Sequence, residues 1–378
     1  MASSRFFLML VLFLLSFIFN IHHSHSQNNT CLSENQKPLF VFGDSLFDSG
    51  NNNYIKTTTF FQGNYHPYGK TFFKYPSGRI SDGRVISDFI AEYADLPFSP
   101  PVYFNPGNLR QYSYGVNFAS SGAGALPETN QGLVIDLKTQ GLYFKRVSKQ
   151  LRQKHGEDRA KKLFSTAVYI FSVGGNDYAS PFYTNPINAT VVLPYPPQNF
   201  VDFVTHNITT VIKEIYNEGG RKFGFLNVAP LTCSPFLRTL ASGTSIEACL
   251  KAQGSALARL HNDALPKSLR KLERQLKGFK YSVFNFYDVL LELIKYPSKY
   301  GFKEGSVACC GGGPYRGDYS CGGKRGIQEY ELCNNVDEYV FFDSPHPSER
   351  AAQHFAQLMW NGNQDVIESY NLKQLFHL

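Results

Sequence analysis

Residues 39–50 read Leu39-Phe40-Val41-Phe42-Gly43-Asp44-Ser45-Leu46-Phe47-Asp48-Ser49-Gly50. The apolar run at their start, Leu39–Phe42, predicts a buried β-strand, and the Gly-Asp-Ser that follows predicts a tight turn. A serine where a strand runs into a helix lies near backbone N–H groups and a helix dipole that stabilise negative charge. The chain contains no Gly-x-Ser-x-Gly sequence, which argues against the common α/β-hydrolase layout.

Four later runs rich in β-branched and aromatic residues also predict strands: Tyr114–Phe118, Ala167–Val173, Phe223–Val228 and Tyr281–Phe286. Helical spacing lies between or after these runs, in Lys138–Lys162 and in the stripe of Leu265, Leu269, Leu272, Leu276 and Phe279. We interpret the basic residues on their other faces as solvent-exposed. Strands that alternate with helices predict an α/β protein whose five-stranded, mostly parallel sheet is covered on both faces.

The composition is that of a globular protein. Of 378 residues, 43% are hydrophobic and 18% are charged, which excludes a disordered or fibrous chain. Lys and Arg outnumber Asp and Glu by 37 to 30, but they form no basic block, so no nucleic-acid partner is expected. No internal repeat or clear linker divides the chain, and residues 27–378 are expected to form one domain.

Residues 1–26 have the features of a secretory signal peptide. Arg5 precedes an almost unbroken apolar run, Phe6–Phe19, and the small residues Ser24 and Ser26 predict cleavage before Gln27. A membrane anchor is the alternative, but the run is shorter than the ~20 residues of a span and no stop-transfer charge follows it. We therefore expect a secreted, extracellular protein with no stable membrane span.

Secretion makes the seven cysteines candidates for disulfide bonds. Cys233 and Cys249 bracket a short loop and are the expected pair. Cys309, Cys310, Cys321 and Cys333 are expected to form two bridges in an undetermined pairing, which leaves Cys31 over. A zinc site is the alternative for these four, but the adjacent Cys309 and Cys310 do not fit zinc spacing, so no metal is expected. Sequons predict glycosylation at Asn28, Asn188 and Asn207.

Ligands of an open α/β sheet bind beyond the carboxyl ends of its strands, so the residues after each predicted strand are candidates for the site. The second strand ends in Asn117–Gly124, where small residues allow a substrate to approach the backbone. The third ends in Val173-Gly174-Gly175-Asn176-Asp177, where the Asn176 amide can donate to an oxyanion. Each stretch taken singly is also an ordinary turn.

Asp343-Ser344-Pro345-His346-Pro347 stands near the end of the chain. A nucleophilic serine needs a base and an acid that orients the base, and an acid and a histidine three apart on a proline-stiffened loop can face one site. Pro347 is expected to be the first residue of the next helix. That helix is expected to bury Ala352, Phe355, Ala356 and Met359.

Together these four motifs resemble the GDSL esterases and lipases of the SGNH hydrolase superfamily, and Phe40–Asn52 is especially similar to plant members. They follow the family's order from Pro38 to beyond Trp360. The resemblance implies a flavodoxin-like three-layer α/β/α fold (the SGNH hydrolase fold). It implies that Ser45 is the nucleophile, His346 the base and Asp343 its acid. It also implies an oxyanion hole formed by the N–H groups of Ser45 and Gly122 and the side chain of Asn176. One departure is Ser121, where plant relatives often have glycine.

The activity implied is that of a secreted serine esterase or lipase, acting on small-molecule or lipid esters through an acyl-Ser45 intermediate and without a cofactor. Its destination would be the apoplast, with the vacuole as alternative. Tyr65–Pro101 and the C-terminal Cys/Gly region resemble a branch that includes defence-related secreted lipases and acyltransferases of specialised metabolism. An acyltransferase with an alcohol acceptor is therefore one alternative, and a catalytically silent binding protein is another. The aromatic loop Tyr65–Tyr75 and the proline-rich loop Pro181–Phe200 are candidate walls of an acceptor pocket, and structural cover is the favoured alternative for any single aromatic residue there.

Overall fold

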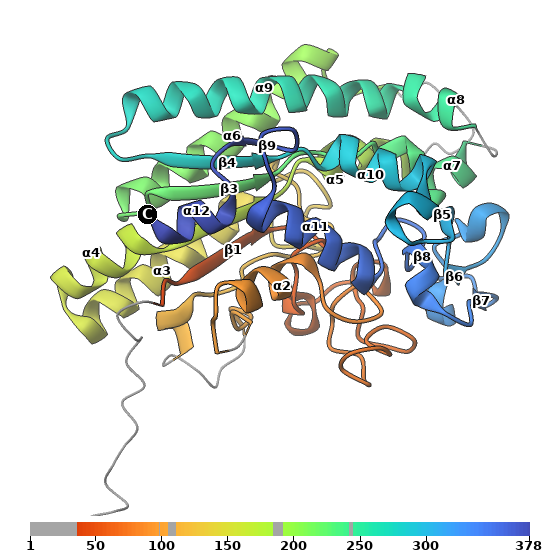
Figure 1. Ribbon diagram of the computed structural model, residues 1–378, viewed down its shortest axis with the longest axis horizontal. Helices are drawn as coiled ribbons and strands as arrows, with labels where there is room; N and C mark the ends of the chain where they lie inside the picture. Colours follow the sequence, from red (N-terminus) through yellow and green to blue (C-terminus); the bar gives the residue numbers. More distant parts are fainter. Residues whose placement is uncertain (1–35, 98, 105–110, 184–191, 242–244) are drawn as a thin grey trace, which may run out of the picture. The chain divides into compact units, whose positions relative to one another are not determined.

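The main sheet has the strand order β1-β2-β3-β4-β9 (Figure 1). A computed structural model describes residues 36–97, 99–104, 111–183, 192–241 and 245–378. The first four strands are parallel, and the fifth is antiparallel to β4. Their bounds are β1 Leu39–Gly43, β2 Val168–Ser172, β3 Lys222–Leu226, β4 Lys280–Phe284 and β9 Ile367–Ser369. The predicted mostly parallel five-stranded sheet is confirmed.

The prediction of a strand at Tyr114–Phe118 was wrong in one respect. The segment lies parallel to β1, since Val41 N–H donates to Val116 O (2.9 Å) and Phe118 N–H donates to Val41 O (2.8 Å). It forms only an isolated bridge there, between Val41 and Asn117. The 3-10 helix η3 (Gln111–Tyr114) takes up its start and Gly115 has a φ of 117°, so few extended residues remain for pairing. β9, which the sequence analysis missed, is the fifth strand.

Helices cover both faces of the sheet (Figure 1). One face packs on α3 (Leu137–His155), α6 (Pro197–Asn217) and α9 (Gln253–Gln275). The other carries α12 (Leu372–His377) on β3 and β4, with α11 (Glu349–Asn361) beside α12 and α2 (Ile86–Tyr93). This is the expected three-layer α/β/α architecture. The remaining α-helices are α4 (Glu157–Thr166), α5 (Gly175–Tyr183), α7 (Pro235–Leu240), α8 (Ile246–Lys251) and α10 (Phe286–Lys295). Within the described ranges, no helix is long and apolar enough to cross a membrane.

Several predicted helix limits need correction. Lys138–Lys162 is two helices, because Gly156, with a φ of 80°, separates α3 from α4. Helix α9 ends at Gln275, so Phe279 lies beyond it, although its ring still stacks on Phe223 at 4.8 Å. Pro347 precedes the helix and is not its first residue, because Ser348 caps α11 by accepting from Ala351 N–H (3.3 Å). The predicted buried residues of α11, Ala352, Phe355, Ala356 and Met359, are buried.

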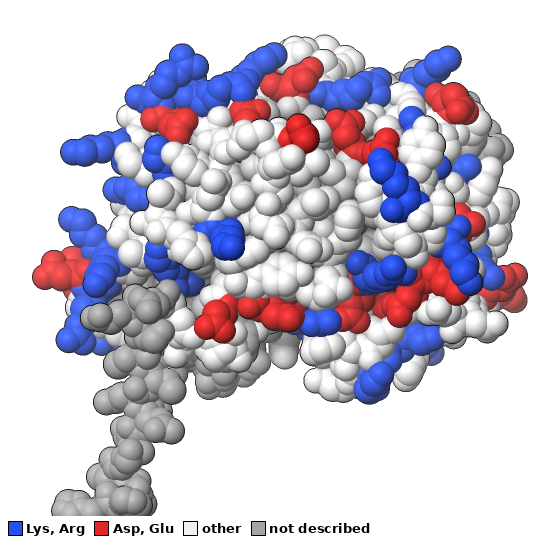
Figure 2. Space-filling view, in the orientation of Figure 1, with Lys and Arg blue, Asp and Glu red and all other residues white. Residues whose placement is uncertain are grey.

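The expected loop Pro181–Phe200 is partly helical. Pro181 lies inside α5, and Pro197 is the first residue of α6. Residues 184–191 between them, which include Asn188, lie outside the described residues. The interpretation of α9 holds: Lys267, Arg270, Lys271 and Arg274 are exposed, and Figure 2 shows basic and acidic side chains mixed along this edge of the molecule.

Two rows of aromatic rings cross one face of the sheet. The in-register pairing of β1, β2 and β3 aligns Phe40, Tyr169 and Phe223 in one row and Phe42, Phe171 and Phe225 in the other. Neighbouring rings stack with centroids 4.9–5.4 Å apart. Stacked rings add to the stability gained from burying their area. These rows account for much of the core's aromatic content and hold the strand ends that carry the site in fixed register.

The Gly- and Cys-rich segment 301–335 contains only short elements: β5 (Glu304–Ala308), β6 (Cys310–Gly311), β7 (Glu331–Leu332) and single turns of 3-10 helix. β5 pairs with β8 (Tyr339–Phe341). Disulfides join Cys309 to Cys333 and Cys310 to Cys321, and a third joins Cys233 to Cys249. The four late cysteines therefore form disulfides and not a zinc site.

Candidate active site

Ser45 follows β1 in a tight turn. Gly43 has a φ of 134°, and a Cβ there would lie 2.0 Å from Ser172 O, so the close approach of β1 to β2 requires glycine. The Asp44 carbonyl accepts from the N–H groups of Phe47 (3.1 Å) and Asp48 (2.9 Å), which closes a single turn around Ser45. The next element, η1 (Asn51–Tyr54), is one turn of 3-10 helix. The expectation that a helix dipole stabilises negative charge at Ser45 was therefore wrong.

The structure brings Ser45, His346 and Asp343 together. His346 Nδ1–H donates to Asp343 Oδ1 (2.7 Å), because a carboxylate only accepts, and this leaves Nε2 to accept from Ser45 Oγ–H (2.8 Å). The loop that holds the pair is closed by Phe342 N–H, which donates to His346 O (2.9 Å). Asp343 is 0% exposed and His346 8% exposed, so the couple is shielded while Ser45 remains partly accessible.

The proposed oxyanion donors lie beside Ser45 on the same cavity, which Ser45, Gly122 and Asn176 all line. Among the described residues, no protein group accepts from the backbone N–H of Ser45 or of Gly122. Asn176, in the first turn of α5, donates from Nδ2 to Ala123 O (3.0 Å). An amide carries a second N–H, so this bond does not exhaust Asn176 as a donor.

Position 122 requires glycine. Its φ is 84°, and a Cβ there would lie 2.3 Å from a ring carbon of Phe61. The following segment is anchored by Asp177, whose carboxylate accepts from the N–H groups of Ala125 and Leu126 (2.9 Å each). Asp177 thereby ties the end of the Gly122 loop to the helix that carries Asn176.

The residues after Ser45 hold the Gly122 loop from the other side. Asp48 accepts from Ser121 N–H (2.9 Å), and Asn52 donates to Ser121 O (2.9 Å), which is the other end of the peptide unit that contains Gly122 N–H. Asn51 donates to the carbonyls of Asn117 (2.9 Å) and Ala119 (2.8 Å). This role of Asp48–Asn52 was not predicted from the sequence, because the contacts join segments that lie about 70 positions apart.

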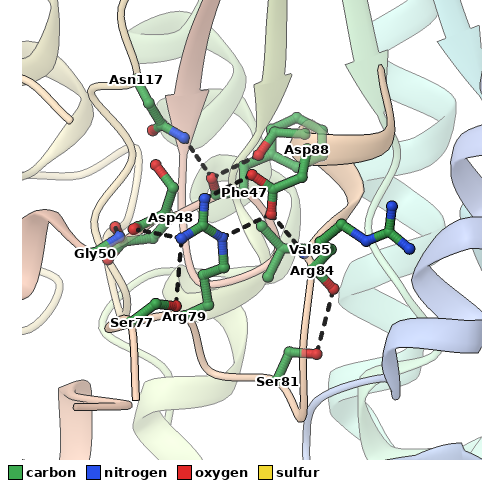
Figure 3. Close-up of polar contacts among 12 residues, drawn as sticks. Phe47, Asp48, Gly50, Ser77, Arg79, Ser81, Arg84, Val85, Asp88 and Asn117 are labelled. Carbon is green, nitrogen blue, oxygen red and sulfur yellow. Dashed lines mark hydrogen bonds and ion pairs between the residues drawn. The ribbon is translucent and has the colours of Figure 1, made fainter. Parts of the chain in front are cut away.

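A buried ion pair lies behind the same turn (Figure 3). Arg79 binds both oxygens of Asp88 at 2.7 Å and donates to Ser49 O (3.2 Å). Beside it, Asn117 Nδ2 donates to Phe47 O (2.7 Å), and Asp48 Oδ1 accepts from Gly50 N–H (2.7 Å). The Arg79 guanidinium lowers the pKa of the Asp88 carboxyl against the opposing effect of burial. The pair fixes the backbone just beyond the candidate nucleophile.

The cavity beside Ser45 has a volume of ≈ 130 Å³, and most of its lining is apolar. The walls come from the ends of β2 and β3, α5, α7, α10 and residues 60–61, with side chains that include Phe60, Tyr183, Leu231, Phe236, Phe286 and Leu290. Tyr65–Tyr75 does not line it, which leaves structural cover as the interpretation of that loop; among the described residues of Pro181–Phe200 only Tyr183 lines it, and residues 184–191 lie outside the described ranges. The role of α7 and α10 as cavity walls could not be predicted from the sequence, because their apolar residues also fit an ordinary core stripe.

Among the described residues that line this cavity, Asp44 is the one with a carboxyl group, and it is 6% exposed. It accepts from Leu46 N–H (3.1 Å) and from Ser172 Oγ (3.0 Å). Burial raises its pKa to about 7, because the charged form is disfavoured away from water. Of the predicted glycosylation sites, Asn207 lies half-exposed on α6, and Asn28 and Asn188 lie outside the described residues.

A strand-end serine, a histidine–aspartate pair and nearby amide donors are the parts that hydrolases use to transfer acyl groups through serine. The chain matches the family described as GDSL-like Lipase/Acylhydrolase over residues 39–359, and it belongs to this family. It is by that membership a carboxylic ester hydrolase. GDSL esterase/lipase 2 of Arabidopsis thaliana is 51% identical over 353 residues, covering 93% of this chain and 92% of the relative.

Two further relatives differ in how similar they are to this chain. GDSL lipase of Tanacetum cinerariifolium is 48% identical over 347 residues, covering 92% of this chain and 90% of the relative. Inactive GDSL esterase/lipase-like protein 25 of Arabidopsis thaliana is 33% identical over 379 residues, covering 100% of this chain and 80% of the relative.

Proposed function

We propose that this protein is a secreted serine esterase that transfers an acyl group from an ester to Ser45 and then to water. The observation that carries the proposal is the unbroken pair of hydrogen bonds from Ser45 Oγ to His346 and from His346 to Asp343, at the edge of an apolar cavity. The cavity suits the acyl part of a small-molecule or lipid ester.

In the proposed reaction, Ser45 Oγ attacks the ester carbonyl carbon while His346 Nε2 takes the hydroxyl proton. The N–H groups of Ser45 and Gly122 and the Asn176 amide stabilise the oxyanion. The carbon–oxygen bond to the alcohol then breaks, and His346 returns the proton to the leaving oxygen. Water attacks acyl-Ser45 with His346 again as base, which releases the acid and restores Ser45.

We further propose that residues 1–26 are removed on secretion, that residues 27–378 form one domain, and that Asn28, Asn188 and Asn207 carry glycans. The three disulfides support an oxidising destination outside the cytosol. The sequence features favour the apoplast, with the vacuole as alternative. Peptide mapping of the protein secreted from plant cells tests the cleavage before Gln27 and each glycan.

The experiment that tests the activity is hydrolysis of p-nitrophenyl acetate, butyrate and octanoate by wild type, Ser45→Ala and Ser49→Ala. Ser49 is the matched control, because it lies in the same motif and its Oγ has no hydrogen-bond partner among the described residues. We expect Ser45→Ala to lose a factor of ~10³–10⁶ in kcat, and Ser49→Ala to keep wild-type activity. An active Ser45→Ala enzyme would contradict the acyl-Ser45 mechanism.

The same assay separates the alternatives. An acyltransferase would turn over faster when an alcohol acceptor is added, and the acyl group would appear on that alcohol and not as free acid. A silent binding protein would hydrolyse none of the esters with or without acceptor. The apolar cavity is the feature that supports the transfer alternative, since an apolar acceptor alcohol would bind there more favourably than water.

A further inference from the structure

Both oxygens of the Asp343 carboxylate are occupied. Oδ1 accepts from His346 Nδ1 (2.7 Å) and from His346 N–H (2.9 Å). Oδ2 accepts from the hydroxyl of Tyr68 (2.7 Å), a residue 275 positions earlier in the chain that is itself 0% exposed. The tyrosine therefore binds the carboxylate on the side away from the histidine, where a rotation of Asp343 would otherwise be free.

A buried arginine stands behind this tyrosine. The side chain of Arg325 is 1% exposed, and its Nη1 donates to the Tyr68 hydroxyl and lies 3.9 Å from Asp343 Oδ2. Its other nitrogens donate to backbone carbonyls, Nε to Thr59 O (3.0 Å) and Nη2 to Gln62 O (2.9 Å). These bonds fix the guanidinium and connect the segment 59–68 to the disulfide-bridged segment that carries Arg325.

The direction of each bond follows from the chemistry of the groups. Arg325 has no acceptor, so its bond to Tyr68 uses a lone pair of the hydroxyl, and the single O–H of Tyr68 is left to point at Asp343. Burial raises the pKa of the Tyr68 phenol well above its ordinary value, so the phenol stays neutral and keeps the proton that it donates. The guanidinium also compensates a carboxylate that would be costly to bury alone.

Aromatic rings enclose the guanidinium and reach the histidine. The Arg325 guanidinium carbon lies 3.7 Å from the centroid of the Tyr319 ring, and that ring lies 6.0 Å from the imidazole of His346. The titratable groups that face Asp343 from neighbouring segments are thus Tyr65, Tyr68, Tyr319 and Arg325. Arg325 carries the one positive charge among these four.

We propose that Tyr68 and Arg325 are positioning residues, which hold the Asp343 carboxylate in the orientation that receives His346 Nδ1–H and balance its charge. The inference rests on the proposed function, since it concerns the acid that orients the base of that reaction. It implies that loss of the Tyr68 hydroxyl misaligns His346 toward Ser45 without changing the cavity that binds the acyl group. Loss of Arg325 has the same effect on His346, but it also removes contacts to Tyr319 and to the backbone beside Phe60 and Phe61, which line that cavity.

The test is steady-state hydrolysis of p-nitrophenyl butyrate by Tyr68→Phe, Arg325→Gln and Arg325→Lys beside wild type and Ser45→Ala. We expect kcat to fall about tenfold in Tyr68→Phe, with KM unchanged within about twofold, and by roughly 10²-fold in Arg325→Gln, since hydrogen bonds to charged groups are the strong ones. Arg325→Lys keeps the charge and is expected to recover part of the loss. The rate of Ser45 labelling by a fluorophosphonate should fall in parallel.

Tyr169→Phe is the matched control, because it also removes a buried tyrosine hydroxyl bond, to Phe164 O (2.9 Å), but away from the site. It should keep the wild-type kcat, and thermal unfolding of all variants identifies any that fail to fold. If Arg325→Gln does not fold, Tyr68→Phe decides the question. Wild-type kcat in Tyr68→Phe, or a change in KM alone, overturns the inference while an inactive Ser45→Ala keeps the proposed function. An inactive wild type overturns both.

Discussion

Asn176 is the residue whose proposed role is least apparent from its contacts in the free protein. Its Nδ2 donates to Ala123 O (3.0 Å), and the second N–H of that amide is available to the cavity that Asn176 lines. A donor of this kind acts on the charge that develops in the transition state, so it should affect kcat more than substrate binding.

We therefore expect Asn176→Ala to lower kcat by ~10²–10³ with a much smaller effect on KM, the usual cost of one oxyanion donor. Asn176→Asp is the sharper variant, because it keeps the size of the side chain and removes both N–H donors; it should lose at least as much. The measurement is kcat and KM on p-nitrophenyl butyrate. A wild-type kcat in both variants would remove Asn176 from the oxyanion hole.

Residues close in sequence were easier to predict than residues brought together by the fold. Asp343 and His346 are three apart on one loop, so their pairing could be inferred from the sequence, and the family resemblance linked them to Ser45. Tyr68 and Arg325 are 257 positions apart in irregular segments. A single tyrosine and a single arginine carry no periodic or motif signal, so only the folded contacts show that they meet at Asp343.

At the scale of elements, the ion pair of Arg79 and Asp88 joins α2 to the backbone that follows Ser45. Both side chains are buried, at 10% and 2% exposed, so removal of one leaves the other as an uncompensated charge. We expect Arg79→Met to lower the free energy of unfolding by about 3–5 kcal/mol. The measurement is urea unfolding.

Two controls make the prediction specific. The double variant Arg79→Met/Asp88→Leu removes both charges and should lose less stability than Arg79→Met alone. Lys303→Met breaks an exposed pair with Glu338, in which the lysine side chain is 74% exposed, and should leave the free energy of unfolding nearly unchanged. Equal losses in the double and single variants would mean that packing, and not charge, decides the cost at this position.

The strands that the sequence predicted well are those with a run of mostly apolar and aromatic residues. The cores of β1 to β4 could be predicted because each stretch is rich in apolar and aromatic residues, and the structure buries each five-residue strand almost wholly. β9 has three residues of which only Ile367 is buried, so no alternation identifies it. Residues 114–118 were predicted as a strand because their composition is that of one, but Gly115 and η3 decide their backbone.

For the whole molecule, the buried carboxyls set a pH dependence of stability. Burial raises the pKa of Asp44 to about 7 and those of Asp82 and Asp177 to about 6, from an ordinary value of 3.8. Burial also lowers the pKa of His261 from 6.5 to about 3, which acts in the opposite sense. The pH dependence of stability is therefore a sum of opposing contributions, and the contribution of one group must be isolated by comparing variants.

Asp44→Asn isolates the group nearest Ser45, because the asparagine oxygen can still accept from Leu46 N–H and Ser172 Oγ. Between pH 3.8 and about 7 the folded wild type holds a proton on Asp44 that the unfolded chain has lost. This contribution to stability is complete at the acidic end of that window and is lost as the pH rises through it. Relative to Asp44→Asn, the free energy of unfolding of wild type should fall by up to about 4 kcal/mol across this window, because the pKa of Asp44 rises from 3.8 in the unfolded chain to about 7 in the folded protein.

Urea unfolding of wild type and Asp44→Asn from about pH 4 to about pH 8 measures this difference. His261 and Asp82 are present in both proteins, so their contributions cancel in the comparison, whereas the charge of Asp177 interacts with Asp44 and adds a smaller contribution that does not cancel. The gap in free energy should grow steadily toward neutral pH and level off above about pH 7. A gap that stays constant across the range would mean that Asp44 is ionised throughout in the folded protein, with its bonds to Leu46 and Ser172 outweighing the effect of burial.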